Sequence, residues 1–212
     1  QNGKLVRVSW DDALSVMAER FRATQKAYGP ESLGVLSTGQ LVTEEFYTLG
    51  KLVQLGFGTN NYDGNTTLCM ASAVSGYKIS FGSDGPPGAY EDMERADVVL
   101  LIGANLADNH PILCQYLDAN HNKTLIVADP RVSKTAMMAD IHLPLKPRSD
   151  LALLNGIAHI LIRYNLIDRE YVDKHTAGFA ALQNFLEAYA PDRVAEITGL
   201  SEETIFKTAL LY

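Results

Sequence analysis

Short apolar runs alternate with longer segments of helical periodicity along most of the chain. A continuous apolar run bounded by turn-forming residues is typical of a strand buried on both faces of a parallel sheet. The run at residues 97–102 is the clearest example, because it is apolar almost throughout and ends in Gly103. Compact apolar runs predict strands at residues 33–37, 97–102 and 125–128, and strand-like segments occur at residues 3–8 and 141–145.

Apolar residues at helical spacing predict helices between and after these strands. Ser9 is well placed to cap the first helix, since Asp11 and Asp12 follow in its first turn. The segment at residues 82–88 is rich in glycine and proline and is expected to be an irregular loop. The predicted helices cover residues 10–26, 42–55, 69–81, 90–95, a segment from 111, a segment up to 139, 151–164, 168–175, 179–189, 191–198 and 201–211.

Strands that alternate with helices predict an α/β fold with a doubly wound, mostly parallel sheet. The chain after residue 166 shows helical periodicity and no strand pattern. We therefore predict an α/β domain at residues 1–166 and a helical extension of the same domain at residues 167–212.

Composition narrows the class of protein. Apolar residues make up 47% of the 212 residues and charged residues 20%, which suits a globular chain with a full core. The net charge of −7 and the absence of a basic stripe disfavour nucleic-acid binding. The apolar runs are too short for membrane insertion. The first residue is Gln1 and the last lies in a helical pattern, so we expect a piece of a longer polypeptide.

The two cysteines form no disulfide framework and no Cys-x-x-Cys pair, which favours a reducing, cytoplasmic compartment, with a periplasmic parent as the alternative. Cys114 lies in a helical pattern and is expected in the core. Cys69 follows a run of turn formers at residues 59–65 and precedes a helix. The positive end of a helix dipole favours a thiolate, which is either a nucleophile or a soft-metal ligand. The alternative is a half-buried structural cysteine.

Polar and glycine residues follow the predicted strands, at residues 38–40, 103–105, 129–133 and 148–150. In a doubly wound sheet, ligands bind at the carboxyl ends of the strands. Asp129 has the placement used to hold ribose hydroxyls, and Arg131 and Arg148 can pair with phosphate. Asp150 can accept two parallel N–H bonds from the edge of a guanine. Together these residues predict a large nucleotide, and the lack of Gly-x-Gly-x-x-Gly or Walker sequences disfavours NAD and ATP.

Several segments, in order along nearly the whole chain, resemble the molybdopterin oxidoreductase family. Within that family, Cys-Met-Ala-Ser-Ala at residues 69–73 is similar to the nitrate reductases, especially the bacterial assimilatory and periplasmic types. Formate dehydrogenases usually carry a histidine directly after the cysteine or selenocysteine, whereas this chain has Met70. The resembling segments are residues 9–14, 66–73, 103–107 with His110 and Pro111, 129–131 and 149–155.

The resemblance implies a Rossmann-like cofactor domain that binds molybdenum through two molybdopterin guanine dinucleotides. Cys69 would be the metal ligand, Met70 would line the substrate funnel, and Gln40 and Asn65 would touch the cofactor near the metal. The intact protein would reduce nitrate to nitrite by oxygen-atom transfer. The residues implied to hold the dinucleotide are Ile102, Gly103, Ala104, Asn105, Leu106, Asp108, Asn109, Asp129, Pro130, Arg131, Ser133, Arg148, Ser149 and Asp150.

Family members also carry an N-terminal domain with four clustered cysteines that binds an iron–sulfur cluster, and a later domain that closes the funnel. This sequence contains neither, so the 4Fe–4S cluster is expected in an absent N-terminal part and the chain alone is expected to be inactive. The expected partners are nitrate and an electron donor that the sequence does not identify. The alternatives are a formate dehydrogenase or another oxidoreductase of the family, and a non-catalytic scaffold related to the NADH dehydrogenase large subunit.

Overall fold

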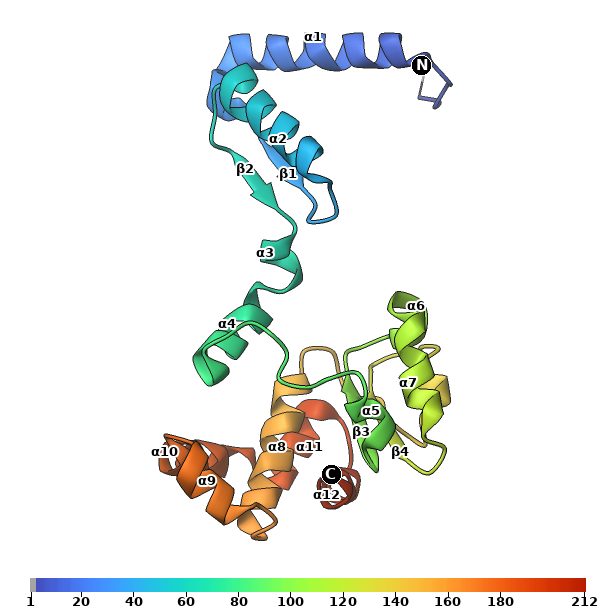
Figure 1. Ribbon diagram of the computed structural model, residues 1–212, viewed down its shortest axis with the longest axis vertical. Coiled ribbons are helices and arrows are strands. Elements are labelled where there is room, and N and C mark those ends of the chain that lie inside the picture. Colours follow the sequence, from blue (N-terminus) through green and yellow to red (C-terminus); the bar gives the residue numbers. More distant parts are fainter. Residues whose placement is uncertain (1–2) are drawn as a thin grey trace. The chain divides into compact units, whose positions relative to one another are not determined.

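A computed structural model describes residues 3–212 (Figure 1). The chain divides into two compact units, Gln1–Pro86 and Pro87–Tyr212. The boundary lies within the glycine- and proline-rich segment that the sequence predicts to be irregular.

The first unit is built on a pair of parallel strands, β1 (Val35–Ser37) and β2 (Tyr62–Gly64), in which Ser37 lies opposite Gly64. The long helix α1 begins after Ser9, whose hydroxyl accepts the Asp12 N–H at 3.1 Å. The other elements of this unit are α1 (Trp10–Tyr28), η1 (Pro30–Ser32), α2 (Thr43–Lys51), η2 (Leu52–Phe57), α3 (Thr66–Cys69) and α4 (Ala71–Phe81).

The core of the first unit is small. It consists of Leu33, Val53 and Phe57, with Val35 and Tyr62 packed against them. Neither α1 nor α4 contains a buried residue, so large apolar side chains on both helices remain exposed. The unit therefore presents more apolar surface than its own core covers.

The second unit contains a three-stranded, fully parallel sheet in the order β3-β4-β5. Its strands are β3 (Val98–Ile102), β4 (Thr124–Ala128) and β5 (Ile141–Leu143). Its helices are α5 (Asp92–Arg95), α6 (Leu106–Asn109), η3 (Pro111–Leu113), α7 (Cys114–Ala119), η4 (Ala136–Met138), α8 (Asp150–Arg163), α9 (Arg169–His175), α10 (Phe179–Leu186), η5 (Glu187–Tyr189), α11 (Pro191–Thr198) and α12 (Glu202–Leu211).

Side chains alternate between the two faces of this sheet. Ile126 and Ala128 of β4 pack into a core with α8, α11 and α12, whereas Leu125 and Val127 pack against α6 and α7. Because helices cover both faces, the second unit is a doubly wound α/β structure, and the predicted α/β fold class with parallel strands is confirmed. The helices α10, α11 and α12, which come from the predicted extension, all pack against α8. The domain boundary at residue 166 stays a prediction.

Several element predictions are wrong in detail. The predicted strand at residues 3–8 has no regular structure, since no described strand pairs with it. The predicted helix up to residue 139 is reduced to the single turn η4, because the chain becomes extended at Ala139 and the Asp140 N–H then bonds to Leu125. The strand β2 lies in a predicted loop, and its pairing with β1 holds it extended.

Candidate cofactor site

The ends of β1 and β2 bring together the residues predicted to lie near the metal in the first unit. The Asn65 N–H donates to the Ser37 carbonyl at 3.0 Å, and the Asn65 side-chain oxygen accepts the Gly39 N–H at 3.0 Å. The Asn65 carbonyl in turn accepts the Cys69 N–H at 2.8 Å. Asn65 therefore links the turn that carries Gln40 to the helix that carries Cys69.

Cys69 is exposed, which is not the half-buried position of a structural cysteine. It is the last residue of the short helix α3, and Met70 separates it from α4. The prediction that Cys69 opens the following helix is therefore wrong, because α4 begins at Ala71 and Met70 stands at its N-cap with a non-helical backbone, at a φ of −143° and a ψ of 13°. The Met70 side chain is 40% exposed and lies next to the thiol in sequence.

The environment of Cys114 is different. It is partly buried against the core beneath α7. Burial raises the pKa of the Cys114 thiol, and the negative charge of Asp118 raises it further.

Limited alkylation with iodoacetamide at neutral pH is expected to modify Cys69 several-fold faster than Cys114. The reagent reacts with thiolate, and Cys114 is both less accessible and less ionised than an ordinary thiol. Peptide mass spectrometry of the 212-residue protein at short reaction times gives the two rates directly. Equal rates would show that Cys69 is covered in solution.

In the second unit, the ends of β3 and β4 lie beside the start of α8. Gly103 has a φ of +60° and donates its N–H to the Ala128 carbonyl at 3.0 Å. A Cβ at this glycine would lie 3.7 Å from the Asp150 carboxylate, so the structure places the end of β3 and the first residue of α8 side by side. A side chain at residue 103 would narrow the space between them.

The segment after β4 is held by its own polar groups. Asp129 is 6% exposed, and one of its carboxylate oxygens accepts the Arg131 N–H at 2.8 Å. The His142 ring nitrogen Nε2 lies 2.8 Å from the Asp129 carbonyl oxygen. The turn thus directs Pro130 and Arg131 outward, and both residues are exposed.

Three predicted contact residues use their side chains inside the protein. Leu106 is buried in the core, and Ile102 packs against the core on the α8 side of the sheet. Ser149 is 2% exposed, and its hydroxyl donates to the Lys146 carbonyl at 2.5 Å. The side chains of these residues therefore serve packing and hydrogen bonding within the protein.

The neighbouring residue Arg148 is exposed and has a φ of +72°, which is strained for a non-glycine residue. The adjacent Ser149 is held by its hydrogen bond to the Lys146 carbonyl, so the chain changes direction at Arg148 before α8 begins.

A polar network connects the segment after β3 to the segment after β4. The Asn105 amide donates to Asp108 at 2.8 Å, and the Lys134 ammonium lies 2.5 Å from the other Asp108 oxygen. The pKa of Asp108 is lowered, first by the hydrogen bond from Lys134 and then by that from Asn105, so this carboxylate is ionised at neutral pH. The buried Thr135 hydroxyl also bonds to Asn105.

Sequence reasoning did not select Thr135, Lys134 or His142. A single threonine or lysine shortly after a turn gives no signal of a partner about 30 residues away in the chain. The remaining predicted contact residues, Ala104, Asn109 and Ser133, lie within the same two segments.

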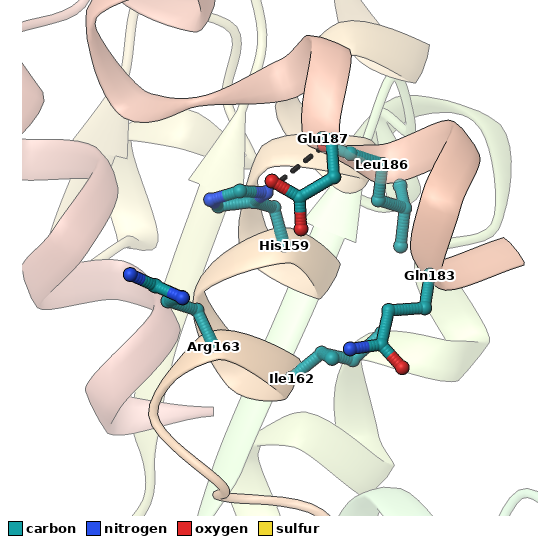
Figure 2. Close-up of a pocket in the computed structure, with 6 residues that line it drawn as sticks. All are labelled: His159, Ile162, Arg163, Gln183, Leu186 and Glu187. Carbon is teal, nitrogen blue, oxygen red and sulfur yellow. Dashed lines mark hydrogen bonds between the residues drawn. The ribbon is translucent and has the colours of Figure 1, made fainter. Parts of the chain in front are cut away.

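A separate cavity of about 100 Å³ lies between the C-terminal part of α8 and the segment formed by α10 and η5 (Figure 2). The His159 Nδ1 atom lies 2.9 Å from the Leu186 carbonyl oxygen, and Arg163 and Glu187 line the opening. His159 is nine residues along α8 from Asp150, which corresponds to roughly 13 Å of helix. This cavity is therefore distinct from the strand ends.

Within residues 3–212, no group of three or more His, Cys, Asp or Glu side chains could hold a metal ion. Across the same residues, no helix is long and apolar enough to cross a membrane.

The second unit defines an α/β protein of the doubly wound class, in which ligands bind at the carboxyl ends of the parallel strands. The molybdopterin oxidoreductase family model matches residues 1–204, and the chain belongs to this family.

The relatives carry more than one activity. A nitrate reductase of Synechocystis is 43% identical over 97% of this chain and 29% of the relative. A periplasmic nitrate reductase of Desulfovibrio desulfuricans is 40% identical over 99% of this chain and 29% of the relative. Formate dehydrogenase H of Escherichia coli is 36% identical over 100% of this chain and 30% of the relative. The chain thus spans less than a third of the length of these relatives.

Among solved structures, acetylene hydratase from Pelobacter acetylenicus matches with a TM-score of 0.66 and 34% sequence identity. The match covers 98% of this chain and 28% of that protein. The fold is therefore that of a molybdopterin enzyme, as the sequence resemblance implies.

Proposed function

We propose that this chain is the central cofactor-binding part of a nitrate reductase whose intact form reduces nitrate to nitrite. One observation carries the proposal: Cys69 is an exposed thiol at the ends of two parallel strands, tied through Asn65 to the turn that carries Gln40. In this role Cys69 is a ligand of molybdenum, Met70 lines the route of the substrate, and Gln40 and Asn65 contact the cofactor near the metal.

The residues present fit a molybdopterin guanine dinucleotide. Thiolate is a soft ligand suited to a heavy transition metal, and a single exposed cysteine leaves most of the coordination to the cofactor itself. When bound, the molybdenum and its dithiolenes supply the redox chemistry, and the protein supplies binding, orientation and electrostatics.

The second unit provides groups that match the nucleotide end of this cofactor. Gly103 allows close approach of a phosphate to the backbone, and the neighbouring Asp150 carboxylate can accept N–H bonds from a guanine edge. Arg131 and Arg148 are exposed cations suited to phosphate. Asp129 retains one carboxylate oxygen for a ribose hydroxyl, because the other accepts the Arg131 N–H.

Nitrate is favoured over formate by the residue that follows the cysteine. Met70 is apolar, has no proton to exchange and is partly exposed beside the thiol, whereas formate dehydrogenases usually carry histidine at this place. Reduction of nitrate to nitrite takes two electrons and two protons and releases water, so an electron donor is required. An iron–sulfur cluster bound outside this chain would deliver the electrons, and the two free cysteines fit a reducing cytoplasm.

A formate dehydrogenase is the second candidate, because formate dehydrogenase H is 36% identical to this chain. A non-catalytic scaffold is the third. The exposed Cys69 argues against a scaffold, since a protein without metal has no need to keep an exposed thiol at the strand ends.

The intact protein, isolated with all residues that flank this chain, is expected to contain molybdenum, to release guanine nucleotide on acid hydrolysis, and to reduce nitrate with a reduced viologen dye. Metal analysis and nitrite formation measure these properties, and formate oxidation by the same preparation is the comparison. Formate turnover without nitrate turnover would assign the second candidate. A protein free of molybdenum and tungsten would be a scaffold. The 212-residue chain alone is expected to be inactive.

A further inference from the structure

One buried hydroxyl joins the two segments proposed to hold a dinucleotide. Thr135 is 0% exposed and lies just after the turn that follows β4. Its hydroxyl donates to the Asn105 side-chain oxygen at 2.9 Å and accepts the Ala107 N–H at 3.0 Å. Both partners belong to the segment that follows β3, so a single side chain spans the two strand ends.

The direction of every hydrogen bond in this network is fixed. The Asp108 carboxylate can only accept, so the Asn105 NH₂ group faces it and the Asn105 oxygen faces Thr135, which must donate to that oxygen while its own oxygen accepts the Ala107 N–H. The Asn105 NH₂ group is then free to donate to Asp108, whose charge is also paired with Lys134. The network has one consistent arrangement, with a charged pair at its exposed end and Thr135 at its buried end.

We propose that Thr135 is a positioning residue for the dinucleotide. It holds the segment at residues 103–109 at a fixed separation from the segment at residues 129–133, so that both segments contact the same guanine dinucleotide of the cofactor. The proposal rests on the proposed function. Thr135 acts through Asn105 and the Ala107 backbone, and its own buried side chain makes no ligand contact. Loss of the hydroxyl leaves the Asn105 side chain with only its bond to Asp108 and removes the buried link between the segments, so that only the exposed Lys134–Asp108 pair still joins their side chains.

Thr135→Val tests this proposal in the intact, cofactor-loaded protein. Valine keeps the branched shape and removes the hydroxyl. The variant is expected to lose guanine dinucleotide about tenfold faster than the wild-type protein, measured as guanine nucleotide and molybdenum retained per folded chain after dialysis. Thr135→Ser keeps the hydroxyl and is expected to retain the cofactor like the wild type.

Thr208→Val is the matched control. Thr208 is 1% exposed, and its hydroxyl bonds only to the Thr204 carbonyl of its own helix, at 2.8 Å. It is expected to change thermal stability without changing the rate of cofactor loss, which separates a positioning role from a merely structural one. If Thr135→Val does not fold, Thr135→Ala makes the same comparison with Thr135→Ser.

The outcomes distinguish the positioning role of Thr135 from the proposed function of the chain. A folded Thr135→Val or Thr135→Ala variant that keeps the dinucleotide as long as the wild type does would overturn the positioning role and leave the proposed function standing. Equal losses in the serine variant and the hydroxyl-free variant would also overturn it, because the hydroxyl would then be irrelevant. Wild-type protein that never contains guanine dinucleotide would overturn the proposed function itself.

Discussion

Replacing Cys69 by alanine is expected to abolish nitrate reduction by the intact protein, with a loss well above the roughly hundredfold upper end for removing an outer-shell partner of a metal. The reason is that Cys69 is the proposed protein ligand to the metal, and its side chain is exposed at the ends of β1 and β2. Cys69→Ser is expected to fail almost as completely, because a serine oxygen is a much harder ligand than a thiolate. Nitrite formation per molybdenum atom is the measurement.

The fold should survive this change. Cys69 is exposed, and substitutions at exposed positions usually change stability by no more than about 0.5 kcal/mol. Cys114→Ala is the matched control, since it removes the other thiol from a partly buried position beneath α7 and leaves the strand ends unchanged. Normal nitrate turnover by Cys69→Ala, with molybdenum still bound, would remove the ligand assignment.

The sequence predicts the central strands of the second unit well, because β3 is a continuous apolar run and β4 is apolar after Thr124. β3 and β4 are buried on both faces, so their pattern depends on local composition alone. β2 has no such pattern, since Tyr62–Gly64 is a short polar strand whose extended backbone depends on pairing with β1, about 27 residues earlier in the chain. Tertiary pairing of this kind leaves no local signal.

The same distinction applies to the candidate site. Glycine, acidic and basic residues after parallel strands can be found from sequence, because strand polarity places all carboxyl ends at one edge of a sheet. The contacts that those side chains make depend on residues that lie far away in the sequence. The side chains of Ser149 and Leu106 are buried, and that of Thr135 connects two loops. These positions depend on tertiary packing, which no short sequence motif encodes.

The division into two compact units could not be predicted from the sequence. The predicted irregular loop at residues 82–88 contains the boundary, but loop composition alone does not say whether the flanking segments share a core. In the structure, the first unit has its own small core, in which Leu33 and the η2 residues Val53 and Phe57 pack against β1 and β2.

Gly156→Ala is expected to destabilise the second unit by about 1–2 kcal/mol, although alanine is the better helix former by about 1 kcal/mol. Gly156 lies inside α8, and a Cβ built there would lie 2.8 Å from one Val194 methyl and 3.1 Å from the other. Val194 is 0% exposed and has a stiff branched side chain, so it cannot move away. Overpacking of this kind typically costs about 1–3 kcal/mol, which exceeds the gain in helix propensity.

Gly76→Ala provides the opposite case within the same chain. Gly76 lies inside α4, and a Cβ built there meets nothing within 4 Å. The same substitution is therefore expected to stabilise its helix by about 0.5–1 kcal/mol. Hydrogen exchange of the α8 amides reports the first effect and that of the α4 amides reports the second.

Adding Val194→Ala to Gly156→Ala should recover part of the loss, because it removes the two methyl groups that the new Cβ would strike. In a double-mutant cycle, the two substitutions should then cost less together than the sum of their separate effects. Strict additivity, or protection of α8 that increases in Gly156→Ala alone, would show that α8 and α11 are not packed closely at this glycine.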